Sequence, residues 1–342
     1  MGLNGLSLPF GKVPVEILEK MVFNHLGAER RELIVGPSVG VDCAVIDVGD
    51  HSLIVSTDPI TGAIERIGWL AVNVNANDVA TFGVRPAFFA SCILLPENAK
   101  EENVEIICKQ MDEAAKKLGI AIMGGHCEVT PGLTHLIIVG CTLGITHKGR
   151  YVTSRDAKPG NKLIITKTIG IEGTAILAND REAQLKGKLD DALLNDAKNF
   201  FNLISVVEEA TMAFQTRGVT AMHDPTEGGI AGGIHELADA SNVGVKIFEE
   251  RIPMAKETFE VCRIFQIDPL QLISSGALLI AAKEDYVEKI VGVLNKKGIS
   301  ASVVGEILKN PQERVLIRRN GSEIEFKRPV YDHLWLALKK HV

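Results

Sequence analysis

The sequence predicts a two-domain protein of the α/β (α+β) class, and three observations point to it. The chain has 342 residues and is 46% hydrophobic and 23% charged, which is enough apolar material for one large or two medium cores. Short runs rich in Val and Ile alternate with stretches of helical periodicity. A polar segment around Pro159 and Gly160 interrupts this alternation and is typical of a domain junction. We therefore expect one domain over residues 1–153 and another over residues 154–342.

Composition and charge exclude several classes of function. The formal net charge is −6 and aromatic residues make up 5% of the chain, which disfavours nucleic-acid and anionic-membrane partners. The most apolar stretch, Leu136 to Thr146, is too short to cross a bilayer, and the N-terminus has no secretion signal. The cysteines form no C-x-x-C pair or metal-finger spacing. We expect a cytoplasmic protein with no membrane and no nucleic-acid partner.

In the first half, helical and strand patterns alternate. The apolar spacing of Val15, Leu18 and Val22 predicts a helix, and Gly49-Asp50 is a turn between two Val-rich and Ile-rich strands. Gly83 and Gly119 each follow a helical stretch, as glycine does at helix C-termini. The expected helices are 14–26, 64–82 and 101–118, and the expected strands are 41–48, 52–57, 87–95, 120–123 and 135–146.

The second half has the pattern of a layered α/β domain. The expected strands are 162–166, 219–222, 244–248, 277–282 and 300–307. The expected helices are 173–178, a long helix at 192–217, 229–240, 256–265 and 285–297. A polar insertion separates the first two of these helices.

Acidic residues stand at the ends of elements in the first half. Asp42 precedes a strand, Asp58 follows one, and Asp78 lies in a predicted helix. Carboxylate oxygens that converge from separate segments are the ligands that Mg²⁺ prefers, and Mg²⁺ bound in this way commonly bridges to substrate phosphates. Asp58 taken alone is equally consistent with a turn or cap residue.

Asp78 is harder to explain as an ordinary residue. It lies in a helix among apolar neighbours, where Asp has poor helix propensity and a high desolvation cost if it is unpaired. Asn73, Asn75 and Asn77 are equally poor helix formers. Such departures from local rules tend to mark functional sites.

Three glycine-containing turns are further candidates. Gly124 and Gly125 let backbone approach a bound group, with His126 or Glu128 directed at it, although His126 is equally consistent with an ordinary turn histidine. Lys167 and Gly170 lie in a strand-to-helix turn that either offers backbone N–H groups to phosphate or serves geometry alone.

Another strand-to-helix turn contains Asp224, which either belongs to the site or caps the following helix. The chain has neither a P-loop motif nor a G-x-G-x-x-G fingerprint.

The order of these motifs resembles the superfamily of aminoimidazole-ribonucleotide (AIR) synthetase, selenophosphate synthetase, thiamine-monophosphate kinase and the HypE-like carbamoyl dehydratase of hydrogenase maturation. Thr57-Asp58 followed by Asn77–Pro86 resembles the signature T-D … N-D-[LV]-A-x-x-G-A-x-P. Residues 159–177 are similar to P-G-D … G-x-x-G-x-A-I-L, and Asp224–Gly229 resembles D-P-T-R-G-G of the dehydratase. The likeness covers roughly residues 35–307 and is nearest the dehydratase.

This resemblance implies a PurM-like fold, in which the N-terminal domain forms a β-barrel shared by a homodimer and the C-terminal domain is layered α/β. It implies ATP and Mg²⁺ as cofactors, with Mg²⁺ held by Asp42, Asp58 and Asp78. The expected nucleotide-binding residues are Lys12, Asp58, Asn77, Gly124, Gly125, Lys167 and Gly170. The expected catalytic residues are Asp78, His126 and Asp224.

Two departures from the dehydratase pattern bear on the acceptor. The dehydratases carry the reacting group on a C-terminal cysteine, whereas this chain ends Lys339-Lys340-His341-Val342 and its last cysteine is Cys262. His126 stands where the dehydratase and the kinase have Asp, and selenophosphate synthetase, which has His there, has a reactive N-terminal cysteine with no counterpart near Gly11-Lys12.

The resulting hypothesis is a phosphoryl-transferring enzyme that uses ATP and Mg²⁺. The acceptor is an amide, thioamide or carboxyl-type small molecule, or a group carried by a partner protein. The alternatives are a small-molecule kinase and a catalytically idle scaffold that binds a nucleotide or a maturation partner.

Overall fold

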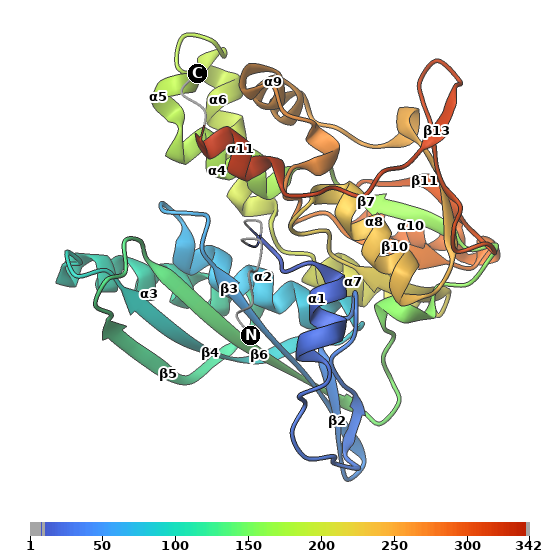
Figure 1. The fold of residues 1–342 in the computed structure, drawn as a ribbon, viewed down its shortest axis with the longest axis horizontal. Coiled ribbons are helices and arrows are strands. Elements are labelled where there is room, and N and C mark those ends of the chain that lie inside the picture. Colours follow the sequence, from blue (N-terminus) through green and yellow to red (C-terminus); the bar gives the residue numbers. More distant parts are fainter. Residues whose placement is uncertain (1–7, 9–10, 340–342) are drawn as a thin grey trace, which may run out of the picture.

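The computed structural model describes residue 8 and residues 11–339, and the rest of the glycine-rich N-terminal segment lies outside this part of the chain. Two mixed α/β units lie side by side, each built on its own sheet (Figure 1). The first sheet uses residues between 33 and 147, and the second uses residues between 162 and 325. The mixed α/β class is therefore confirmed.

The first sheet has six strands in the order β1-β2-β3-β6-β4-β5. Only the β4–β5 pair is parallel among the pairs of this sheet in the described residues. Helices α2 (Ile67–Thr81) and α3 (Glu101–Leu118) pack against each other, and α2 lies against β3 and β6. The strands are β1 (Leu33–Val35), β2 (Ala44–Val48), β3 (His51–Ile60), β4 (Pro86–Leu95), β5 (Ala121–Val129) and β6 (Ile137–His147).

The second sheet has seven strands in the order β13-β12-β9-β11-β7-β10-β8. The strands are β7 (Lys162–Thr166), β8 (Val219–His223), β9 (Gly244–Phe248), β10 (Leu279–Ala282), β11 (Ala301–Leu308), β12 (Arg314–Ile317) and β13 (Glu323–Glu325). The helices are α4 (Ile171–Asp180), α5 (Glu182–Leu185), α6 (Asp191–Lys198), α7 (Val207–Gln215), α8 (Gly229–Ala240), α9 (Lys256–Phe265), α10 (Val287–Lys296) and α11 (His333–Lys339). One core cluster joins α8 to the sheet, and another holds α4, α7 and α10.

Helix α2 is the joint between the two halves. All of its residues are buried, because the first sheet covers one side and α7 and β8 of the second half cover another. The indole nitrogen of Trp69 donates a hydrogen bond to the Phe201 carbonyl at 2.8 Å. The larger core cluster accordingly contains residues of both halves. Polar groups on α2 are therefore held at the boundary between the domains.

Some predicted elements differ from the structure. The helix expected over 14–26 is a short α1 (Val15–Ile17) continued by a π-helical turn, Leu18–Val22. The helix expected over 192–217 is wrong, because α6 and α7 are separated by a 3₁₀ turn, Asn199–Leu203. Buried Phe200 and Phe201 and the contacts of this segment with α2 override its helical periodicity. Strands β1, β12 and β13 and helices α5 and α11 were not predicted.

Strand β5 is longer than predicted and continues through the Gly-Gly-His segment. Backbone pairing with β4 places Gly124 beside Ala90, Gly125 beside Ser91 and His126 beside Cys92. These residues therefore lie in an edge strand, not in a turn. Within residues 11–339, no helix combines the length and apolar character needed to cross a membrane.

Candidate active site

Four aspartates converge where the two halves meet. Asp42 precedes β2, Asp58 lies on β3, Asp78 is on the buried helix α2, and Asp224 follows β8. Ser56, two residues before Asp58 on β3, donates its hydroxyl to the Asp78 carboxylate at 2.5 Å. Since α2 crosses β3 and contacts β8, folding brings these carboxylates together although the chain separates them.

His223 fixes this cluster across the domain boundary. Its Nδ1 lies 2.8 Å from Asp42 Oδ2, and its Nε2 lies 2.8 Å from Glu236 Oε2 on α8. Burial by itself lowers the pKa of this histidine, but the Asp42 and Glu236 carboxylates outweigh burial and raise the pKa well above its usual value. Each ring nitrogen thus faces a carboxylate oxygen, an arrangement that suits an imidazolium donating from both nitrogens. The ring also lies in a group with Asp42 and Asp224 whose donor atoms are within 4.8 Å of one another.

The aspartates have the chemistry of a divalent-cation site. Both carboxylate oxygens of Asp224 are buried with no hydrogen-bond partner among the described residues, and the side chain is 1% exposed. Burial and the Asp42 charge raise the pKa of Asp224 to about 7. Burial and the charge of Asp224 raise the pKa of Asp78 well above its usual value. Orphaned buried oxygens that repel one another fit Mg²⁺, which takes carboxylate ligands and cancels their charge.

Lys12 brings a positive charge to the rim of the cluster. Its Nζ lies 3.3 Å from Glu236 Oε1, and its backbone N–H donates to Glu227 Oε2 at 2.7 Å. Burial lowers the pKa of Lys12, but the charges of Glu236, Asp42 and Asp58 raise it above its ordinary value. Burial raises the pKa of Asp58 to about 6, a shift that Lys12 partly offsets.

Three residues expected to bind the nucleotide are engaged elsewhere. Asn77 donates to the Ile204 carbonyl at 2.9 Å and accepts from the Val206 N–H at 2.8 Å. Lys167 is held by Glu209 at 2.6 Å and also donates to the carbonyls of residues 203 and 205. The Gly170 N–H donates to the Ser274 hydroxyl at 2.8 Å. These contacts favour structural roles, because the polar groups are already satisfied.

The Gly124-Gly125-His126 segment lies away from the aspartates in the single chain. Every residue of β5 is exposed, and His126 Nε2 lies 3.1 Å from Glu128 Oε2 on the same strand. Gly125 is required by close approach of backbone, since a Cβ atom there would clash with the Ser91 carbonyl oxygen. The catalytic and nucleotide-binding roles of these residues remain predictions.

Sequence reasoning missed four residues of the cluster: Ser56, His223, Glu227 and Glu236. His223 and Glu227 stand in the same turn as Asp224, and this turn was the only local signal for them. Glu236 lies two helical turns further on and reaches His223 only because α8 packs beside β8.

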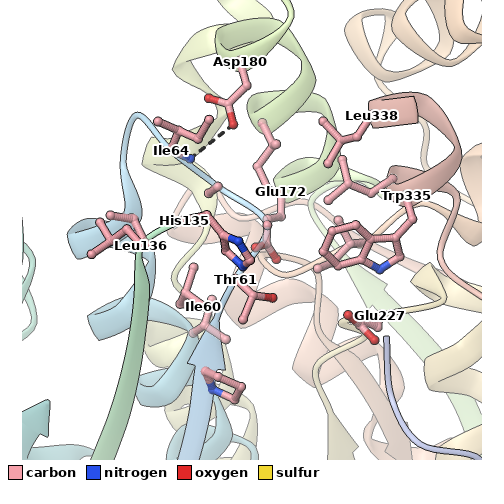
Figure 2. A pocket seen from close by; sticks show the side chains of 18 of the residues that line it. Ile60, Thr61, Ile64, His135, Leu136, Glu172, Asp180, Glu227, Trp335 and Leu338 are labelled. Atoms are coloured by element: carbon pink, nitrogen blue, oxygen red, sulfur yellow. Dashed lines mark hydrogen bonds between the residues drawn. The ribbon is translucent and has the colours of Figure 1, made fainter. Parts of the chain in front are cut away.

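A cavity of about 1170 Å³ opens beside Lys12 and Asp58. Its walls come from both halves, namely β3, α3 and the segment before β6 in the first, and α4 and α11 in the second. Figure 2 shows Glu172 directed into this space, between His135 and Trp335 in that view. The aspartates and the cavity together form one site: a charged end that suits a metal and phosphates, and a largely apolar chamber next to it.

Comparison with known proteins agrees with this architecture. Residues 40–146 match the family model for the N-terminal domain of AIR synthase related proteins, and residues 158–318 match the model for the C-terminal domain. A putative hydrogenase expression/formation protein of Methanocaldococcus jannaschii is 30% identical over 306 residues, which cover 86% of this chain and 88% of that protein.

Two further proteins are similar over most of their length. The carbamoyl dehydratase HypE of Escherichia coli is 29% identical over 262 residues, 75% of each chain. A crystal structure of the hydrogenase maturation protein HypE in complex with ATP superposes with a TM-score of 0.70, covering 94% of this chain and 96% of that chain at 20% identity. That likeness confirms the predicted PurM-like fold.

Proposed function

Since the chain belongs to the AIR synthase related protein family, we propose that it is an enzyme that uses ATP and Mg²⁺ to phosphorylate a small or partner-borne acceptor. The acceptor group is an amide, thioamide or carboxyl, as in the HypE-like branch. The names of its relatives support a place in the maturation of hydrogenase or another metallocofactor.

The observation that carries this proposal is the meeting of Asp224 with the first-domain aspartates. Its two unpartnered oxygens are buried near Asp42 and Asp78, an arrangement that costs folding free energy unless a ligand pairs with them. An idle scaffold would gain nothing from it. A bound Mg²⁺ would supply charge neutralisation at the ATP phosphates, and the oxygens of Asp42, Asp58, Asp78 and Asp224 are the ligands available to it.

The remaining residues of the cluster serve positioning. His223, held between Asp42 and Glu236, keeps the Asp42 carboxylate oriented across the domain boundary. Lys12 lies where its ammonium group neutralises charge on phosphate oxygens. In the transfer, an acceptor oxygen bonds to the γ-phosphorus while the bond from the γ-phosphorus to the β,γ-bridging oxygen breaks, and ADP leaves with that electron pair. An amide acceptor also releases one N–H proton to solvent. In a dehydratase, the C–O bond then breaks, phosphate departs with the acceptor oxygen, and loss of the second N–H proton leaves a nitrile, whereas a kinase releases the phosphorylated acceptor.

A homodimer is part of the proposal. Phe88, Ile122 and Ile145 expose apolar side chains on the strands of the first sheet, and β5 presents a fully exposed edge. Pairing two such sheets would bury this surface. Sedimentation of wild type against Ile122→Asp tests it: a dimer that becomes monomeric is expected, and a monomeric wild type contradicts it.

The nucleotide site is tested by calorimetric titration with the non-hydrolysable analogue AMPPCP, in Mg²⁺ and then in EDTA. We expect saturable binding that requires Mg²⁺ and that weakens at least about tenfold in Asp78→Asn, because one buried metal ligand loses its charge. Asp191→Asn, at an exposed position on α6, is the matched control. Unchanged binding in Asp78→Asn contradicts the site, and no binding to wild type contradicts the function.

A further inference from the structure

The cavity beside the aspartates contains a buried carboxylate that the proposed phosphoryl transfer does not use. Glu172, in the first turn of α4, is 4% exposed, and its Oε2 has no hydrogen-bond partner among the described residues. The Ser275 hydroxyl, also buried and lining the cavity, lies close enough to Glu172 to lower its pKa in part, but it makes no hydrogen bond of ordinary geometry among the described residues. A buried carboxyl oxygen without a partner that faces an open chamber marks a place where a ligand donates a hydrogen bond.

Other acids surround Glu172. Asp58, Glu227 and Asp332 line the same cavity, and burial together with their charges raises the pKa of Glu172 to about 8. Asp332 is occupied by the N–H groups of Gly228 and residue 334. Glu227 accepts from the Lys12 backbone. Glu172 is thus an acid group with an unused oxygen among other acid groups, and a bound cation would favour its ionised form.

Lys12, Arg181 and Lys339 line the cavity, but none of them is among the largest influences on the pKa of Glu172. Lys12 directs its ammonium at Glu236, and Arg181 donates to the Leu338 carbonyl at 2.8 Å. The remaining wall is mostly hydrophobic. Its apolar residues include Ile60, Ile67, Ile176, Ile273, Leu334 and Trp335. A neutral hydrogen-bond donor would satisfy Oε2 but would not offset the charge of the surrounding acids. A cation would donate the hydrogen bond and also stabilise the ionised form of Glu172.

We propose that this cavity binds the acceptor, and that the acceptor carries, besides the group that is phosphorylated, a cationic amine or amidine on an apolar body, whose N–H groups contact Glu172. This inference rests on the proposed function, since it specifies the acceptor for the same site. The cationic end pairs with Glu172 on α4, and the apolar body packs against Trp335 and Ile60, which lie around the same space in Figure 2. Asp58 also lines the cavity and connects it with the aspartate cluster.

The test uses three isosteric probes: benzamidine as the cation, benzamide as the neutral analogue and benzoate as the anion. Ligand-observed NMR measures their affinities for the full chain, with and without AMPPCP and Mg²⁺. We expect wild type to bind benzamidine at least about tenfold more tightly than benzamide, because a charge-assisted hydrogen bond replaces a neutral one. AMPPCP should not displace it.

Two variants test whether the preference for benzamidine depends on Glu172. Glu172→Gln keeps the shape of the side chain and is expected to remove the preference for benzamidine, while Glu288→Gln, at an exposed position on α10, is expected to retain it. The comparison of probes on wild type stands even if Glu172→Gln is unstable.

The inference is overturned if wild type shows no cation preference, if benzoate binds most tightly, if AMPPCP displaces benzamidine, or if a folded Glu172→Gln keeps the preference. AMPPCP affinity measured in the same samples separates the two claims. Normal Mg²⁺-dependent AMPPCP binding without a cation preference refutes the cationic acceptor alone, whereas absent AMPPCP binding refutes the proposed function.

Discussion

The imidazole of His223 lies 2.8 Å from the Asp42 carboxylate and joins the end of β8 in the second domain to the segment before β2 in the first. The ring's other nitrogen bonds Glu236, so one buried cation holds two carboxylates. This arrangement ties the stability of the domain boundary to the geometry of the site.

Loss of this cation should therefore destabilise the protein. His223→Phe removes the hydrogen-bond partner of the Asp42 carboxylate and leaves Glu236 with Lys12 alone, and we expect the free energy of unfolding to fall by about 3 kcal/mol. Urea denaturation measures the change. Arg30→Gln breaks the exposed pair with Glu32 and is expected to have no measurable effect, since such pairs contribute little. Equal losses in the two variants would refute this role for His223.

Asp224 should lower the stability of the metal-free protein at neutral pH. Its pKa is raised to about 7 in the folded state, so the folded protein keeps the proton after the unfolded chain has lost it. The free energy of unfolding of wild type should consequently fall, relative to Asp224→Asn, as pH rises from about 4 to about 7. At pH 8 the variant should be more stable by about 2–4 kcal/mol.

Mg²⁺ should reverse this difference, because it binds more tightly to the protein that keeps all four carboxylates and therefore stabilises it more. Thermal and urea unfolding at several pH values, with and without Mg²⁺, give the curves. If the free energy of unfolding depends on pH in the same way in wild type and in Asp224→Asn, the pKa of Asp224 is not raised in the folded protein.

Substitution of Asn77 distinguishes a structural role of this residue from a role in nucleotide binding. Asn77→Ala removes two buried hydrogen bonds to the 204–206 segment, and we expect a loss of about 2–3 kcal/mol in unfolding free energy with unchanged AMPPCP affinity. Asn73→Ala is the control, because Asn73 bonds only the Trp69 carbonyl of its own helix among the described contacts. A folded Asn77→Ala that binds AMPPCP poorly would restore the expectation from the sequence.

Gly124 and Gly125 of β5 should differ in how much stability the protein loses when each is replaced by alanine. Both have positive φ, but a Cβ atom at Gly125 would clash with Ser91, whereas one at Gly124 meets nothing within 4 Å. Gly125→Ala should cost at least about 1 kcal/mol more stability than Gly124→Ala, because the β4–β5 pairing must shift. Melting temperatures test this, and equal values would argue against a packing requirement at Gly125.

The sequence predicted some parts of the site and not others for physical reasons. Asp78 was identified because an Asp among apolar helix residues violates local propensity. Its neighbour Asn77 looked the same, but successive helix residues point about 100° apart, so Asn77 faces the second domain. Glu236 had no local signal at all, because its role depends on how α8 packs beside β8.

Among the helices and strands, too, some were predicted correctly and others were not. Strand β7 and helices α3, α8 and α9 have the predicted bounds, since their local periodicity and end signals agree with their packing. The prediction of one helix over 192–217 is wrong at residues 201–206, because hydrogen bonds to α2 hold this segment in a path that is not α-helical. Local pattern predicts an element until tertiary contacts compete for its backbone.

The central claim is that the aspartates of the two domains hold a divalent metal on a nucleotide. The most direct measurement is anomalous diffraction from crystals grown with AMPPCP and Mn²⁺ in place of Mg²⁺. The account predicts a manganese peak within bonding distance of carboxylate oxygens of Asp78 and Asp224, with nucleotide phosphate beside it. Bound nucleotide with manganese elsewhere, or no manganese at these carboxylates, would contradict the account.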